Sequence, residues 1–356
     1  MPRRRLRFTA IVALVVAASA MAAAGDRDGL PASLTDRDFW RLVGDLSEAG
    51  GTFRSDNLLS NESRLQFVIP QLVSAVSPGG AYLGVGPEQN FTYIAALKPD
   101  VAFIVDIRRG NLQLHLMYKA LFELSSDRVD FIARLFSRPR PAALSPDASV
   151  ADIFDAFLMI ESSQALYDRN LQAIDAQLVS THGFALSDED LKGIAYVYQA
   201  FFMFGPAIHY SSTEGVGAGY RPTYADLMIA TDGSGVTRSY LASDEAFARV
   251  KELESRNLIV PVVGDFAGTK AIREVAAWLK DRHAIVSAFY LSNVEQYLRL
   301  ERVWGSFCAN AARLPVDASS TFIRAGRGGR YARGTALTAE LGPIAPEVEG
   351  CPRPPN

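Results

Sequence analysis

A glycine-containing turn and an acid that follows it are the residues whose types and spacing best suit ligand binding. Gly84 and Gly86 lie between a strand-like run and a helix-like segment that begins at Asn90, and Asp106 follows Gly84 by 22 residues. Glycines at such a turn let the backbone approach a ligand, the helix N-terminus presents free N–H groups, and the acid can accept hydrogen bonds from ribose hydroxyls. Two interpretations stay open: a ligand-binding loop, or a structural turn that requires glycine.

Other kinds of reactive site have little support in the sequence. The four histidines have none of the spacings that are typical of zinc sites, so no metal site is predicted. No Gly-x-Ser-x-Gly elbow and no Walker-type phosphate loop occur. His115 follows Asp106 closely enough to face the same ligand, or it is a helix histidine satisfied by its neighbours.

Short apolar runs predict the strands that position the turn. They cover residues 81–85, 101–105, 258–263 and 284–290, and residues 320–323 are a candidate fifth strand. Continuous apolar runs of this length are typical of parallel strands that are buried on both faces. Helical patterns alternate with them, at residues 38–46, 64–76, 90–97, 111–124 and 269–281, and a last helix ends near residue 307. The alternation predicts a doubly wound, Rossmann-like α/β fold with a mostly parallel sheet.

A long helical stretch interrupts this alternation. Between residues 127 and 256 the helical periods cover residues 150–160, 164–180, 188–204 and 244–256, and Ser187 with Asp190 forms a candidate capping box. Its aromatic side chains fit either core packing or a lid over the cleft. We therefore expect one α/β domain, with halves at residues 25–126 and 257–325, around a helical insertion at 127–256. An irregular tail rich in Gly, Arg and Pro is expected from residue 326 to residue 356.

The N-terminus has the order of a secretory signal peptide. Arg3, Arg4, Arg5 and Arg7 precede an uncharged run at residues 8–24 that ends in small residues. The run is short for a membrane span and rich in alanine, which favours cleavage over an uncleaved anchor. In either case the rest of the chain crosses the membrane. The sequence therefore predicts a signal peptide at residues 1–24 and a periplasmic or secreted protein.

Export changes the interpretation of the charge and of the cysteines. The whole chain has 36 basic and 39 acidic residues, and removal of four signal-peptide arginines leaves 32 basic residues. A mature charge of −7 argues against a nucleic-acid partner, although Arg324, Arg327, Arg330 and Arg333 form a local basic stretch without an acid. Cys308 and Cys351 are an even pair in an oxidising compartment, so they form a disulfide or stay as two free thiols.

The segment around the glycine turn resembles the class I S-adenosylmethionine-dependent methyltransferases, and more closely a group of uncharacterised bacterial proteins with that kind of fold. The resemblance covers about residues 65–131 and 258–323. It implies that the glycine loop lies against the amino-acid part of the cofactor, that Asp106 holds the ribose, and that Asp265 meets the adenine. The cofactor-binding residues it implies are Gly84, Gly86, Asn90, Asp106 and Asp265.

The resemblance also implies an acceptor side and one departure from the family pattern. Ser292, Asn293 and Glu295 stand after the fourth strand, where the family approaches the methyl acceptor, and Asn293 and Glu295 are the candidate catalytic residues. Glu88 replaces the third glycine of the loop, so a charged side chain is expected near the cofactor path.

Two functions are compatible with these patterns. The first is an exported methyltransferase-like protein that binds S-adenosylmethionine or another nucleoside-like small ligand. The alternative is a non-catalytic periplasmic binding or interaction protein on the same scaffold, since a fold does not determine a function. Neither function predicts a nucleic-acid partner, and each predicts contact with a membrane only through the signal segment.

Overall fold

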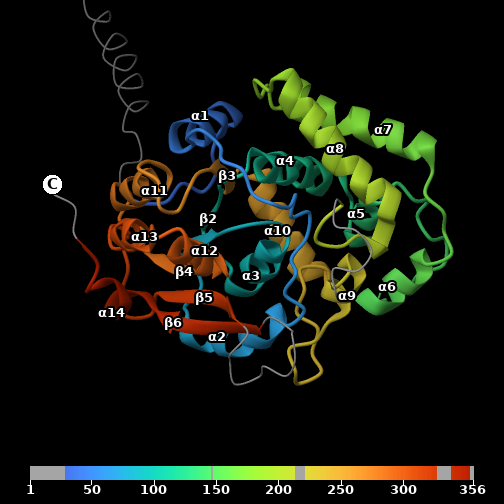
Figure 1. Ribbon diagram of the computed structural model, residues 1–356. Helices are drawn as coiled ribbons and strands as arrows, with labels where there is room; N and C mark the ends of the chain where they lie inside the picture. Colours follow the sequence, from blue (N-terminus) through green and yellow to red (C-terminus); the bar gives the residue numbers. More distant parts are fainter. Residues whose placement is uncertain (1–28, 146, 213–220, 327–337, 353–356) are drawn as a thin grey trace, which may run out of the picture.

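The computed structural model describes residues 29–145, 147–212, 221–326 and 338–352, and these contain one six-stranded sheet (Figure 1). The strand order is β3-β2-β1-β4-β5-β6. The first five strands of the chain pair in parallel, and β6 is antiparallel to β5. The strands are β1 (Ala81–Gly84), β2 (Val101–Asp106), β3 (Ile259–Val263), β4 (Val286–Ser292), β5 (Thr321–Gly326) and β6 (Thr338–Pro343).

The predicted doubly wound α/β fold is confirmed, and so is the candidate fifth strand. All residues of β1, β2 and β3 are buried, because helices cover both sides of the sheet. One group that packs together is α1 (Asp36–Leu46), α11 (Ala271–Lys280) and α13 (Trp304–Ala311). The other is α2 (Ile69–Ala75), α3 (Gln89–Leu97), α4 (Arg109–Leu124) and α10 (Asp244–Ser255). A 3-10 turn, η1 (Leu65–Val68), leads into α2.

Between α4 and β3 the described residues form helices and no strand. Figure 1 shows α5 to α9 gathered beside the sheet, and α8 packs against α4. The elements are α5 (Arg128–Leu135), α6 (Val150–Phe157), α7 (Gln164–Asp175), a π-helical turn (Ala176–Thr181), α8 (Asp188–Phe204), a 3-10 turn (Gly205–Ala207) and α9 (Tyr224–Ile229). The last helix of the expected insertion, α10, packs on α3 and α4, which belong to the α/β part of the chain.

The helix starts agree with the capping chemistry in the sequence. The predicted capping box at Ser187 and Asp190 is confirmed: each side chain is bonded to the other residue's backbone N–H. Ser243 caps α10, since its hydroxyl accepts from the backbone N–H of Ala246. The single helix expected to end near residue 307 is instead divided into α12 (Val294–Leu300) and α13, and Arg302 between them has a φ of +60°. A left-handed residue ends a helix because it turns the chain away from the helix axis.

The prediction of an irregular tail at residues 326–356 is wrong for residues 338–348. Residues 338–343 form β6, which extends the sheet along β5, and residues 344–348 form α14 (Ile344–Val348). Residues 338–343 form a strand because they pair with β5, and the local sequence pattern gave no sign of this strand. Cys308 of α13 and Cys351 are joined by a disulfide that holds this tail against the body. Three of the four arginines of the basic stretch, at 327, 330 and 333, lie outside the described residues.

The signal-peptide prediction lies outside the described residues too, since these begin at residue 29. Among the helices that the structure describes, none is long and apolar enough to cross a membrane.

Candidate functional site

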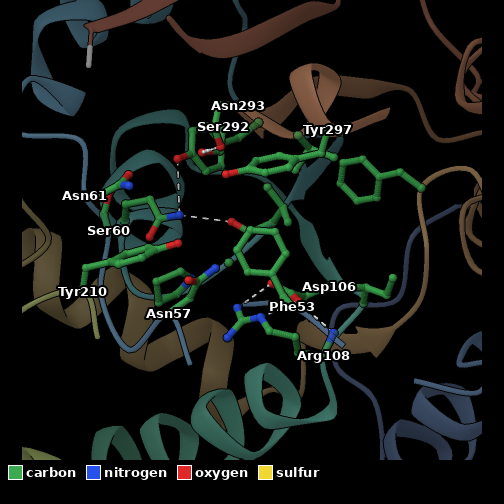
Figure 2. A pocket seen from close by; sticks show the side chains of 18 of the residues that line it. Phe53, Asn57, Ser60, Asn61, Asp106, Arg108, Tyr210, Ser292, Asn293 and Tyr297 are labelled. Carbon is green, nitrogen blue, oxygen red and sulfur yellow. Dashed lines mark hydrogen bonds and ion pairs between the residues drawn. The ribbon is translucent and has the colours of Figure 1, made fainter. Parts of the chain in front are cut away.

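A cavity of about 160 Å³ lies at the carboxyl ends of the parallel strands, beside the point where the strand order reverses between β1 and β4. Open α/β sheets bind ligands at this point. For scale, an engineered protein cavity of about 150 Å³ admits benzene, so this volume suits a ring-sized group. The walls come from residues 52–62, from the loops after β1, β2 and β3, from Tyr210, and from residues 290–301. In Figure 2, Ser292, Asn293 and Tyr297 border one side, and Asp106 with Arg108 the opposite side.

The glycine loop after β1 has a structural reason for each glycine. A Cβ on Gly84 would lie 2.0 Å from Oδ1 of Asn90, and Gly86 has a φ of +78°, where L-residues are strained. Asn90 holds the loop: its amide donates to the carbonyls of residues 85, 86 and 87 within 3.1 Å, and its Oδ1 accepts from Tyr82. Of Gly84, Gly86 and Asn90, only Gly86 lines the cavity. Asn90 is therefore a clamp of the loop, with its hydrogen bonds directed inside the protein.

His115 completes the support of this loop. Its Nε2 is 2.9 Å from the carbonyl oxygen of Gly86, and burial lowers its pKa to about 4. The neutral ring therefore donates to that carbonyl through Nε2. His115 does not line the cavity, and its Nε2 has a local partner, whereas its Nδ1 is buried without one.

Asp106 lines the cavity, but Arg108 covers its carboxylate. The Arg108 guanidinium makes two contacts with it, at 3.1 Å to Oδ1 and 2.8 Å to Oδ2, and the Arg108 backbone N–H donates to Oδ1 at 2.8 Å. A further guanidinium N–H of Arg108 donates to the carbonyl of Asp56. A carboxylate has about four acceptor positions. Three are filled, so Asp106 cannot accept from two ribose hydroxyls while Arg108 stays in place.

Of the predicted site residues after β3 and β4, two line the cavity and one does not. Asp265 lines the cavity, although its Oδ1 accepts from the backbone N–H of Ala267. Asn293 also lines it. Glu295 does not: its carboxylate forms an ion pair with Arg324 at 2.6 Å, on the far side of the first turn of α12. The cavity therefore brings together Gly86, Asp106, Asp265 and Asn293, and it leaves out Gly84, Asn90 and Glu295.

The expected position of Glu88 is wrong. Its side chain is fully buried, and both carboxylate oxygens lie 3.3 Å from the backbone N of Ser60, away from the cavity. Burial raises its pKa to about 8, so at neutral pH the group is mostly uncharged. The third loop position therefore anchors residue 60 and brings no negative charge into the ligand path.

Glu62 is the main cavity residue that the sequence patterns did not indicate. Its side chain is 1% exposed, and its Oε1 accepts from the hydroxyls of Tyr290 at 2.5 Å and Ser292 at 2.6 Å. Its Oε2 is buried without a hydrogen-bond partner. Burial raises the pKa of Glu62, although these two hydroxyls act in the opposite direction. Ser292 has a φ of +50° at the end of β4, a strained backbone that persists where surrounding contacts enforce it.

Gln89 and three aromatic rings complete the site. The Gln89 amide N–H donates to the carbonyl of Val85 at 3.1 Å, whereas its Oε1 is buried without a partner. Phe53 and Tyr297 meet edge to face with ring centres 5.2 Å apart, and Tyr210 lies across from them (Figure 2). Residues 52–62 lack a repeated pattern, so only an unusual density of Ser, Asn and Glu before the first strand signals their role.

No metal centre is indicated by these side chains. Within the part of the chain that the structure describes, no group of three His, Cys, Asp or Glu residues is placed to hold an ion.

The chain belongs to a family described as a domain of unknown function, DUF7790, whose model matches residues 58–145 and 218–339, more than half of the chain. A comparison with curated proteins found no match. The matched segments include Glu62, Gln89 and Ser292, whereas Phe53 and Tyr210 lie outside them.

Proposed function

We propose that this chain is an exported protein of methyltransferase-like architecture that binds a nucleoside-like small molecule in the cavity at the β1–β4 switch point. One observation carries the proposal: polar and aromatic side chains from loops far apart in the sequence converge on a single concave site at the ligand-binding edge of the sheet. Core packing alone does not explain this convergence. Polar groups are buried at a cost unless they have hydrogen-bond partners, so a cluster of them at one cavity suggests that a ligand supplies partners.

The proposed role is ligand binding without methyl transfer. S-adenosylmethionine supplies an activated methyl group when bound, and Gly86 leaves room for a ligand beside the loop after β1. The residues do not fit the ribose contact that the resemblance implies, because Arg108 holds the carboxylate of Asp106. Glu295, a candidate catalytic residue, is paired with Arg324 outside the cavity. These contacts favour the non-catalytic alternative among the two functions.

Export is part of the proposal, because the first 24 residues have the order of a signal peptide. A reporter enzyme that is active only outside the cytoplasm, fused to the C-terminus of the full chain, should be active. An inactive reporter on a stably produced fusion would remove export from the proposal.

Calorimetric titration tests the ligand. Folded protein should give saturable heat with S-adenosylmethionine, S-adenosylhomocysteine or adenosine, each used up to millimolar concentration. Asn293→Trp places a large ring in the cavity and should abolish that heat. Gln296→Trp is the matched control, because Gln296 is an exposed residue of α12 outside the cavity. The proposal fails if the folded wild-type protein gives no heat with any of the three compounds, or if both tryptophan variants bind as the wild type does.

A further inference from the structure

We propose that the cavity selects a small organic cation with N–H donors, and that Glu62 is the residue that recognises its positive group. The inference rests on the proposed function in one respect: the same cavity must be the ligand site. It adds the chemical class of the group that enters deepest. Three independent observations support it.

The first observation is the charge of the walls. The acidic and basic side chains that line the cavity are four carboxyls and one guanidinium, namely Glu62, Asp106, Asp265, Glu301 and Arg108. Arg108 is bonded to Asp106, so this base neutralises one of the acids. The remaining acids give the cavity a negative character, and a cleft lined by one sign of charge attracts ligands of the opposite sign.

The second observation is a pair of open acceptors. Oε2 of Glu62 and Oε1 of Gln89 are both buried without a hydrogen-bond partner, and both residues line the cavity. Their side chains are 1% and 2% exposed, so solvent does not reach them freely. An unsatisfied buried acceptor is unfavourable, and a ligand that donates to it removes that penalty. A third acceptor without a partner in the cavity wall is Oδ1 of Asn57, on a less buried residue. Three such acceptors favour a ligand with several hydrogen-bond donors.

The third observation concerns the groups around Glu62. Tyr290 and Ser292 donate to its Oε1, so they orient the carboxylate and leave its Oε2 for the ligand. The titratable groups that are coupled to it are three buried tyrosines, Tyr82, Tyr93 and Tyr290, and the buried carboxyl of Glu88. None of these groups supplies a positive charge. A positive ligand group is the missing partner, since a buried carboxylate is stable when it is paired and hydrogen-bonded.

The aromatic walls fit the same class of ligand. Phe53, Tyr210 and Tyr297 line the same cavity as Glu62 and the Asp106–Arg108 pair. Ring faces attract cations and also pack against flat apolar groups. A cavity of about 160 Å³ therefore suits an ammonium group that is attached to a ring-sized body.

Four probes that share one benzene ring separate charge, hydrogen bonding and shape. Benzylamine carries an ammonium, benzyl alcohol is neutral, benzoate is an anion, and benzyltrimethylammonium is a cation without N–H groups. Calorimetry or ligand-observed NMR on the full mature chain at pH 7 should show benzylamine binding at least tenfold more tightly than benzyl alcohol. Benzyltrimethylammonium should be intermediate, and benzoate should not bind.

Glu62→Gln then assigns the preference to its residue. The variant keeps the size of the side chain and removes the charge, so the advantage of benzylamine over benzyl alcohol should fall below threefold. Glu274→Gln is the matched control, because Glu274 is an exposed acid of α11 outside the cavity, and it should keep the full advantage. Circular dichroism and the melting temperature show that both variants are folded.

The possible results separate this inference from the proposed function. Equal affinity for benzylamine and benzyl alcohol, or a preference for benzoate, overturns the cation inference even if adenosine compounds bind. An amine preference that Glu62→Gln leaves unchanged also overturns it. An amine preference that depends on Glu62, without heat from any nucleoside compound, supports the cation inference and refutes the nucleoside ligand. If Glu62→Gln does not fold, the wild-type comparison of the four probes still decides the class.

Discussion

Two glutamates, the buried Glu62 at the cavity and the partly buried Glu123 near the end of α4, show how the same residue type serves two purposes. Both oxygens of Glu123 have partners: Oε1 pairs with Lys119 at 2.8 Å, and Oε2 accepts from His182 at 2.6 Å and from Gln177 at 2.8 Å. In Glu62 two hydroxyls share one oxygen, and the other oxygen has no partner. A filled set of partners indicates a structural role, whereas an open position on a residue that lines a cavity leaves a place for a ligand donor.

The pKa values of the two carboxyls move in opposite directions. Burial acts to raise both. At Glu123 the hydrogen bond from His182 and the charge of Lys119 outweigh burial and lower the pKa. At Glu62 hydroxyl groups alone do not outweigh it, so the pKa stays above its ordinary value. The difference shows that burial alone does not determine the charge of a glutamate; the charge of its partners does.

The largest effect is expected when the partnered carboxylate is neutralised. Glu123→Gln should lower the free energy of unfolding by about 3 to 5 kcal/mol, because it leaves the buried ammonium of Lys119 without its counter-ion. Urea denaturation at pH 7 measures this change. A loss below 1 kcal/mol would mean that the cluster around Glu123 does not stabilise the fold, and the contrast with Glu62 would disappear.

A somewhat smaller loss is expected at Asn90, another buried polar group with a full set of partners. Asn90→Ala removes one amide that serves three carbonyls of the loop after β1, and it should cost about 2 to 3 kcal/mol of unfolding free energy. The same denaturation series, with Asn293→Ala as the control at the cavity edge, measures it. Equal and small losses in both variants would contradict the assignment of Asn90 as the loop clamp.

The pH dependence of His182 gives a third test. Burial lowers its pKa, but the hydrogen bonds and charges of Glu123 and Asp36 raise it above the ordinary value of 6.5. This stabilisation is therefore complete below pH 6.5 and is lost as the pH rises through the higher pKa of the folded protein. Wild type and His182→Gln, compared by urea denaturation at pH 6 and pH 9, should differ by about 1 to 2 kcal/mol more at pH 6, after allowance for solvent screening. A difference that does not depend on pH would show that the charge of His182 is not involved.

The smallest effect on stability is expected at Glu62. Glu62→Gln should change the free energy of unfolding by less than about 1 kcal/mol at pH 4, because a carboxyl whose pKa is raised above 4.5 is mostly protonated at that pH and an amide replaces it. A raised pKa means that the wild-type protein loses stability as the pH rises above the ordinary value of 4.5, so the variant should gain relative to the wild type toward pH 8. Denaturation at both pH values checks the sign. A large loss in the variant would make Glu62 structural, like Glu123.

Much of the α/β framework was predictable because it depends on local patterns. The apolar runs at residues 101–105 and 258–263 became fully buried parallel strands, and Ser187 with Asp190 became a capping box. The tail after residue 326 was mispredicted because β6 is held by pairing with β5 and by the Cys308–Cys351 disulfide, both of which are contacts between distant segments.

The site was predictable only in part, for the same reason. The loop after β1 and the ends of the neighbouring strands meet at one edge of a parallel sheet by topology, so Gly86, Asp106, Asp265 and Asn293 converge as expected. Glu295 does not, because on α12 it turns toward Arg324 of β5. Which face of α12 carries Glu295, and where its partner Arg324 lies, became clear only in the packed structure.

By itself the sequence determined the order of the five parallel strands, the glycine turn and its acids, because these follow from local hydrophobic periods and backbone conformation. The tertiary structure decided which acid is available to a ligand. Arg108 binds the carboxylate of Asp106, and the carboxyl of Glu88 accepts from the backbone N–H of residue 60 and does not line the cavity. Glu62, from the segment before the first strand, does line it. Availability depends on burial and on partners that are distant in the chain, and only folding brings those together.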